Sequence, residues 1–133
     1  MEERNPLKIL LVEDSAVLAD RLSEMLRHIP GVTLVDTVDN EHAAVSIARS
    51  QQIDVMILDL HLRQGTGFGV LRALADQPHS AVAIVLTNYA LPQYQRAASA
   101  LGVRYFLDKA REFERIPDAL REIADAASAT AAS

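Results

Sequence analysis

Five polar side chains lie at the ends of short apolar runs, and together they could bind a divalent cation and a phosphoryl group. Short runs of β-branched and aliphatic residues, each followed by a segment with helical periodicity, are typical of parallel strands. In open α/β sheets the carboxyl ends of such strands meet in one crevice, where these folds bind ligands. We expect three carboxylates, a hydroxyl and an ammonium to meet there: Glu13, Asp14, Asp59, Thr87 and Lys109.

The charges of this group predict a metal ion. Two like charges about 4 Å apart repel by roughly 4 kcal/mol at an effective dielectric constant near 20, so clustered carboxylates need cations. Lys109 supplies one positive charge. Mg²⁺ held by Asp14 and Asp59 would supply the rest, because Mg²⁺ binds carboxylates, water and phosphate oxygens. We assign Glu13 to the same metal site, where it would orient a metal-bound water.

Asp59 is the candidate nucleophile. A carboxylate can accept a phosphoryl group and form an acyl phosphate. Phosphoryl transfer spreads negative charge over the equatorial oxygens, so its catalysis depends on positioning and on cations. Lys109 would pair with one of these oxygens, and the Thr87 hydroxyl would donate to another.

The composition limits the class of protein. A chain of 133 residues, half of them apolar, suits one globular domain. The net charge of −5 argues against direct nucleic-acid binding, which needs a basic surface. The absence of cysteine excludes disulfides, thiol catalysis and cysteine-bound zinc. The sequence shows no signal peptide and no stretch that could span a bilayer, so we expect a cytoplasmic protein without membrane contact.

Predicted strands and helices alternate five times along the chain, which indicates a doubly wound parallel sheet of the α/β class. Ser15 and Asn40 are good N-caps for the first two helices, and Pro92 suits the first turn of the fourth. The last helix carries apolar residues at helical spacing: Phe113, Ile116, Leu120 and Ile123. The strands are expected near residues 8–12, 32–38, 53–59, 82–87 and 104–108.

The chain divides into three expected segments. Residues 1–6 form an N-terminal extension, and residues 7–124 form the domain. Residues 125–133 are rich in alanine and serine and have no large apolar side chains. We expect this tail to fray beyond the end of the last helix.

Residues 7–124 resemble the receiver domain of two-component response regulators. The resemblance rests on four motifs in order, each at a strand end: Glu13-Asp14, Ile-Leu-Asp-Leu-His-Leu around Asp59, Thr87-Asn88, and Tyr-Phe-Leu-Asp-Lys ending at Lys109. It implies a flavodoxin-like fold with five helices and the strand order 2-1-3-4-5. It also implies Mg²⁺-dependent transfer of a phosphoryl group to Asp59 from a histidine kinase or a phosphotransfer protein. The backbone carbonyl of His61 would be a further metal ligand.

The resemblance further implies a switch. Thr87 would move toward the phosphoryl group, and the aromatic residue three positions before the lysine, here Phe106, would turn inward behind it. The family more often has tyrosine at that position, and phenylalanine has no hydroxyl to hold in solvent. The proline that usually follows the lysine is Ala110 here, which leaves the geometry of the Lys109–Ala110 loop open. Arg63 stands at another position where proline is common in the family.

We expect a stand-alone response regulator rather than a conventional turnover enzyme, because little chain remains after the last helix for an output domain. It would catalyse only its own phosphorylation and dephosphorylation. Its output would be docking on an unidentified downstream protein, or self-association as a homodimer. In this family the usual contact surface is formed by the helix that starts at Pro92, the strand near 104–108 and the last helix.

Several alternatives stay open from the sequence. A degenerate receiver could act as a phosphorylation-independent docking module, and Phe106 and Ala110 leave room for this. Phosphatases of the haloacid-dehalogenase type also use Asp, Thr and Lys, but they place the nucleophile after the first strand, where this chain has Glu13-Asp14-Ser15. A nucleotide or flavin site is disfavoured because the first turn is acidic and lacks glycine.

Two aromatic side chains are expected beside the crevice. His61 and Tyr89 each follow a candidate site residue by two positions, and we expect them to govern how easily water reaches the acyl phosphate. Tyr89, Leu91 and Tyr94 fit either an exposed partner surface around the fourth helix or ordinary packing.

Overall fold

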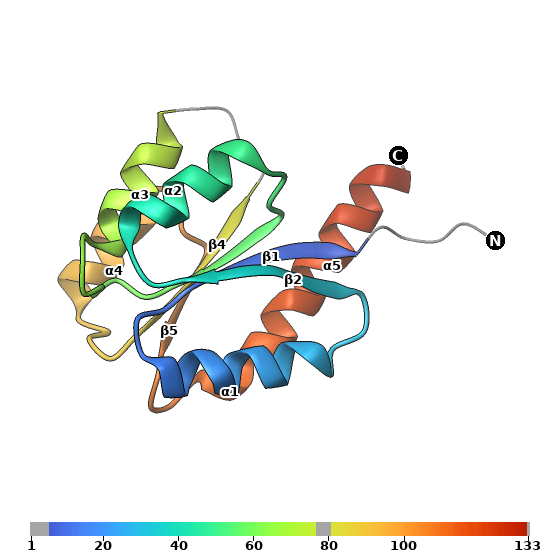
Figure 1. Ribbon diagram of the computed structural model, residues 1–133. Coiled ribbons are helices and arrows are strands. Elements are labelled where there is room, and N and C mark those ends of the chain that lie inside the picture. The colour runs from blue at the N-terminus through green and yellow to red at the C-terminus, as the bar shows by residue number, and fades with distance from the viewer. Residues whose placement is uncertain (1–5, 77–80, 133) are drawn as a thin grey trace.

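A computed structural model describes residues 6–76 and 81–132. These residues form a parallel five-stranded sheet in the order β2-β1-β3-β4-β5, with helices on both faces (Figure 1). The strands are β1 (Leu7–Val12), β2 (Val32–Val38), β3 (Val55–Leu58), β4 (Val82–Thr87) and β5 (Tyr105–Asp108). The helices are α1 (Ala16–Arg27), α2 (Glu41–Ser50), α3 (Gly67–Ala75), α4 (Pro92–Ala100), the short 3₁₀ helix η1 (Phe113–Arg115) and α5 (Ile116–Ala132). The predicted flavodoxin-like α/β fold is confirmed.

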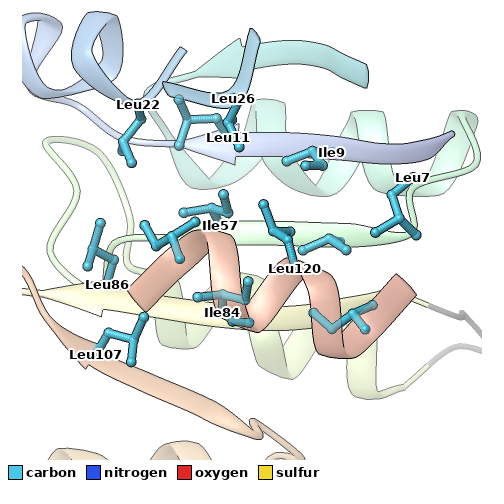
Figure 2. Packing of buried hydrophobic residues seen from close by; sticks show 14 of the residues in the cluster. Leu7, Ile9, Leu11, Leu22, Leu26, Ile57, Ile84, Leu86, Leu107 and Leu120 are labelled. Atoms are coloured by element: carbon cyan, nitrogen blue, oxygen red, sulfur yellow. The ribbon is translucent and has the colours of Figure 1, made fainter. Parts of the chain in front are cut away.

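The sheet is covered on both faces, which explains why its three inner strands, β1, β3 and β4, are nearly continuous apolar runs rather than alternating ones. Helices α1 and α5 lie against one face, and α2, α3 and α4 lie against the other (Figure 1). Ile9 and Leu11 of β1 point toward α1 and α5, where Leu120 packs over the strands (Figure 2). Leu10 and Val12, between them in the sequence, belong to the core on the opposite face. Each fully buried Leu or Ile contributes about 1.5–3 kcal/mol to folding.

The predicted helix starts are held by side-chain caps. Ser15 Oγ accepts a hydrogen bond from the Leu18 amide, and Asn40 Oδ1 accepts one from the Ala43 amide. Pro92 is the first residue of α4, where its missing N–H leaves no helical hydrogen bond unmade. These three residues fix where α1, α2 and α4 begin, and therefore where the loops after β1, β2 and β4 end.

The last helix differs from its prediction in two respects. Phe113 lies in η1 rather than in α5, which begins at Ile116 and has Pro117 in its first turn. The sequence predicted that the helix ends near Ala124 and that the following tail frays. Instead α5 continues to Ala132, and the alanines of this segment favour the helix because alanine has the highest helix propensity.

Among the described residues, the helices are too short or too polar to cross a bilayer.

Candidate functional site

The parallel register brings the ends of four strands to one edge of the sheet. Val12 pairs with Leu58, so Glu13 and Asp59 follow at adjacent positions, and the Asp59 amide donates to the Val12 carbonyl at 3.0 Å. The Lys109 amide donates to the Thr87 carbonyl at 2.9 Å, which joins the ends of β4 and β5 in the same way. The structure therefore places the five residues singled out in the sequence at one edge of the sheet.

Lys109 lies between two buried carboxylates. Its Nζ is 2.8 Å from Glu13 Oε1 and 2.8 Å from Asp59 Oδ2. The side chains of Glu13, Asp59 and Lys109 are only 3%, 6% and 9% exposed, so little solvent screens these contacts. Sequence reasoning placed Lys109 near the Asp59 phosphoryl group but did not find its second contact with Glu13.

Burial shifts the pKa values of two of these groups. Burial raises the pKa of Glu13 above its ordinary value, and the hydrogen bonds from Lys109 and from the Ser15 amide offset only part of this rise. Burial by itself would lower the pKa of Lys109, but its hydrogen bonds to Asp59 and Glu13 outweigh burial and leave that pKa raised. Lys109 therefore keeps its positive charge at neutral pH.

Glu13, Asp14 and Asp59 form a group that could hold a metal ion. Each offers one carboxylate oxygen, and these oxygens lie within 4.8 Å of one another. Glu13 and Asp59 are buried, whereas Asp14 is half-buried. An all-oxygen carboxylate set fits Mg²⁺, and when ionised the three carboxylates together with the Lys109 ammonium leave two uncompensated negative charges, which one Mg²⁺ would neutralise.

Thr87 is fully buried at the end of β4. Its Oγ1 accepts a hydrogen bond of 3.1 Å from the Tyr89 amide, two residues along the chain. This bond connects the hydroxyl to the loop that leads into α4, so a movement of Thr87 would involve that loop.

His61 contacts the site through its backbone and an aromatic cluster through its ring. Its amide donates to Asp59 Oδ1 at 3.2 Å. Its ring centroid lies 4.6 Å from that of Tyr89 and 5.8 Å from that of Tyr94. Tyr94 is half-buried and also contacts Phe68, with ring centroids 6.0 Å apart. Tyr94 is thus packed against the loops of the site, a contact that its position in the sequence could not reveal.

The loop after Lys109 does not need the proline that is usual in the family. No described peptide bond is cis, so the Lys109–Ala110 bond is trans. Asp108 Oδ1 accepts from the amides of Ala110 and Arg111 at 2.8 and 3.3 Å. Glu112 Oε1 accepts in turn from the Asp108 amide at 3.1 Å. Two acidic side chains therefore shape the turn that carries Lys109.

Phe106, the predicted switch residue, is half-buried on β5 and packs against the core that faces α2, α3 and α4. It also lines a surface hollow of about 260 Å³ between α4 and β5, together with Gln95, Ser99, Arg104 and Arg115. Its role as a switch stays a prediction.

Comparison with known proteins agrees with this geometry. The chain belongs to the response regulator receiver domain family, whose model matches residues 9–121. It is 29% identical, over 91% of its length, to protein-glutamate methylesterase/protein-glutamine glutaminase 5 of Anaeromyxobacter dehalogenans. It is 27% identical, over 88% of its length, to the transcriptional regulatory protein DesR of Bacillus subtilis. The chain spans only 36% and 58% of these two relatives, which continue beyond the matched segment.

Solved structures share the fold. The structure resembles a LuxR-family DNA-binding response regulator from Staphylococcus aureus, with a TM-score of 0.82 and 20% identity, covering 88% of this chain and 98% of that one. It also resembles the response regulator domain of Thermotoga maritima CheB, with a TM-score of 0.79 and 20% identity, covering 90% and 95% of the two chains. At these identities the likeness establishes the fold alone.

Proposed function

We propose that this receiver domain accepts a phosphoryl group on Asp59 from a histidine kinase or a phosphotransfer protein, in a Mg²⁺-dependent reaction. The observation that carries the proposal is the environment of the Asp59 carboxylate. Lys109 Nζ contacts one of its oxygens and the His61 amide contacts the other, beside the Glu13 and Asp14 carboxylates. A strand-end carboxylate with a cation on one oxygen and a donor on the other suits acceptance of a phosphoryl group.

In the proposed reaction a carboxylate oxygen of Asp59 attacks phosphorus. The new O–P bond makes an acyl phosphate, and the P–N bond of a phosphohistidine donor breaks, so that its electron pair returns to the imidazole. Lys109 stabilises the negative charge on the transferring group, and the Thr87 hydroxyl donates to another of its oxygens. When bound to Glu13, Asp14, Asp59 and the His61 carbonyl, Mg²⁺ supplies the remaining charge neutralisation.

Attack of water on the acyl phosphate would release phosphate from Asp59 and end the signal. In this proposal the protein catalyses only its own phosphorylation and dephosphorylation. Phosphorylation would draw Thr87 toward the phosphoryl group and move the β4–α4 loop to which Tyr89 connects it. Phe106 would fill the space behind Thr87, and the surface of α4, β5 and α5 would change its affinity for a downstream protein or a second copy. This role places the protein in the cytoplasm. The stand-alone arrangement stays a prediction, since the relatives above are longer proteins.

The test is intact-mass spectrometry after incubation with Mg²⁺ and acetyl phosphate, with Asp59→Asn as the paired variant. We expect one added phosphoryl group in the parent, none in Asp59→Asn, and none in EDTA. A kinase-dependent assay follows if acetyl phosphate is not used as a donor. Failure to accept phosphate from either donor, together with failure to bind Mg²⁺, would favour the phosphorylation-independent docking module instead.

A further inference from the structure

Three glycines that follow Asp59 in the sequence lie so close to Asp59 or to Glu41 that a side chain at their positions would not fit. A Cβ at Gly67 would overlap the carbonyl oxygen of Asp59 itself. Cβ atoms at Gly65 and Gly69 would both overlap the side chain of Glu41, at the start of α2. Gly65 also has a φ of +81°, which side chains rarely adopt. The segment 64–69 therefore lies closely against Asp59 on one side and against Glu41 on the other.

Glu41 fastens this segment through its side chain and its backbone. Its Oε1 accepts a hydrogen bond of 2.9 Å from the Thr66 amide. Its own amide donates to the Gln64 carbonyl at 3.1 Å, and Asn40 and Gln64 form an isolated parallel β-bridge. Glu41 lies in the first turn of α2, and Thr66 is the N-cap of α3. Glu41 therefore links the start of α2 to the start of α3.

The fastened segment is in turn bonded to the residues around Asp59. Thr66 forms an antiparallel bridge with His61. The Gly67 amide donates to the Leu60 carbonyl at 3.0 Å. The His61 amide then donates to Asp59 Oδ1 at 3.2 Å. Three hydrogen bonds, joined by the backbone between Thr66 and Gly67 and between Leu60 and His61, therefore lead from the Glu41 carboxylate to the carboxylate of Asp59.

We propose that Glu41 is a positioning residue for the Asp59 site. It acts through the segment 64–69, which holds the His61 backbone in place, so that the His61 amide orients the Asp59 carboxylate. The inference deepens the proposed function, on which it rests, and it explains why glycine stands at positions 65 and 69. Glu41 is not a catalytic residue, because its contacts are with the segment and not with the reacting atoms.

The test compares Mg²⁺ affinity, measured by calorimetric titration, with the amide resonance of His61 in two-dimensional NMR spectra. Glu41→Ala removes the acceptor for the Thr66 amide. We expect the Mg²⁺ dissociation constant to rise a few-fold, less than the roughly tenfold that loss of a direct partner of a metal ligand costs, because Glu41 acts through the intervening segment. The His61 amide resonance should shift. Glu41→Gln keeps an acceptor oxygen while removing the charge, and it should stay close to the parent in both measurements.

Two further variants separate positioning from general stability. Gly69→Ala would displace the Glu41 carboxylate from the other side of the contact, so it should reproduce the effect of Glu41→Ala. The double variant should then be no worse than Glu41→Ala by itself. Asp54→Ala is the matched control, because Asp54 Oδ2 accepts from the Lys8 amide at 2.8 Å, at the opposite end of the strands. It should lower the unfolding temperature and leave Mg²⁺ affinity unchanged.

Parent-like Mg²⁺ affinity and an unshifted His61 resonance in folded Glu41→Ala and Gly69→Ala would overturn the inference. A loss in Glu41→Gln equal to that in Glu41→Ala would also overturn it, since the charge and not the hydrogen bond would then matter. Neither measurement involves phosphoryl transfer. Failure of the parent to become phosphorylated would therefore count against the proposed function, and not against this role of Glu41.

Discussion

The inner part of the site and its rim differ in burial and in what holds them in place. The inner group consists of Glu13, Asp59, Thr87 and Lys109, and each of these side chains is at least nine-tenths buried. Contacts of 2.8 Å join Lys109 to Glu13 and to Asp59. The rim consists of Asp14, His61 and Tyr89. Asp14 is half-buried, His61 is exposed and Tyr89 is 53% exposed. Charges buried together are costly to separate, whereas exposed groups can move at little cost. Substitutions in the inner group should therefore affect folding and chemistry together, whereas substitutions of the exposed rings of the rim, His61 and Tyr89, should act mainly on rates.

The largest effect is expected for Lys109→Ala. Removing the ammonium leaves the Glu13 and Asp59 carboxylates buried without a partner, which typically costs about 3–5 kcal/mol. Urea unfolding in EDTA should show a loss of this order, and added Mg²⁺ should restore part of it. Phosphorylation should become poor and the phosphorylation-dependent response should be lost. An unchanged unfolding midpoint in EDTA, or normal phosphorylation-dependent partner binding, would contradict this account of Lys109.

Mg²⁺ should stabilise the parent by a smaller amount. An ion that binds only the folded protein adds about 2.7 kcal/mol when its concentration is 100 times the dissociation constant. Thermal unfolding with increasing Mg²⁺ should show a rising midpoint in the parent. Asp14→Asn should lose most of this rise, because it removes one of the three clustered carboxylates. Asp39→Asn, at an exposed position outside the cluster, should behave like the parent.

The pH dependence of Mg²⁺ binding should be smaller still. Burial raises the pKa of Glu13 above its ordinary value of 4.5, so the folded protein binds a proton there at a pH at which the unfolded chain does not. Stability from Glu13 itself therefore falls as the pH rises from 4.5 through the raised pKa. Because the proton competes with the metal, Mg²⁺ affinity should fall as the pH is lowered through the same range. Glu13→Gln should flatten this dependence, and a parent-like slope in that variant would assign it to another group.

The smallest effects are expected for the two aromatic residues of the rim, His61 and Tyr89. An aromatic pair contributes about 0.5–1.5 kcal/mol beyond the area that it buries, so loss of the His61–Tyr89 contact should change rates only a few-fold. His61→Ala and Tyr89→Ala should each alter the rate of dephosphorylation, followed by loss of the phosphoryl mass after removal of the donor. The unfolding free energy should fall by no more than the contribution of the pair, about 0.5–1.5 kcal/mol. Identical dephosphorylation rates in parent and variants would show that neither ring controls how easily water reaches the acyl phosphate.

The identity of the inner residues could be predicted from the sequence, whereas several of the contacts in and around the site could not. The inner residues were recognisable because each closes a short apolar run, and parallel strands bring such ends to one edge. The contact of Lys109 with Glu13 joins residues far apart in the sequence and leaves no periodic signal in either. The same holds for Tyr94 against His61, and for the hydrogen bond between Glu41 and Thr66.

Two features of the β5–α5 region could not be predicted correctly from the sequence: the geometry of the loop after Lys109 and the length of α5. Ala110 left the loop geometry open, and the structure shows a trans bond with Asp108 and Glu112 holding the turn. Both acids are close in the sequence, but only the folded turn decides which amides they accept from. The length of α5 was underestimated because the prediction relied on large apolar residues to continue a helix, whereas alanine continues it by propensity.

The sequence by itself determined the fold class, the order in which strands and helices alternate along the chain, and the residues at the strand ends. These depend on local quantities: the spacing of apolar residues, the capping side chains and the position of proline. Tertiary structure decided which oxygens Lys109 contacts, how burial shifts the pKa of Glu13, and how Glu41 reaches the loop beside Asp59. Those properties depend on distances between separate elements and on exclusion of water, and neither exists until the chain has folded.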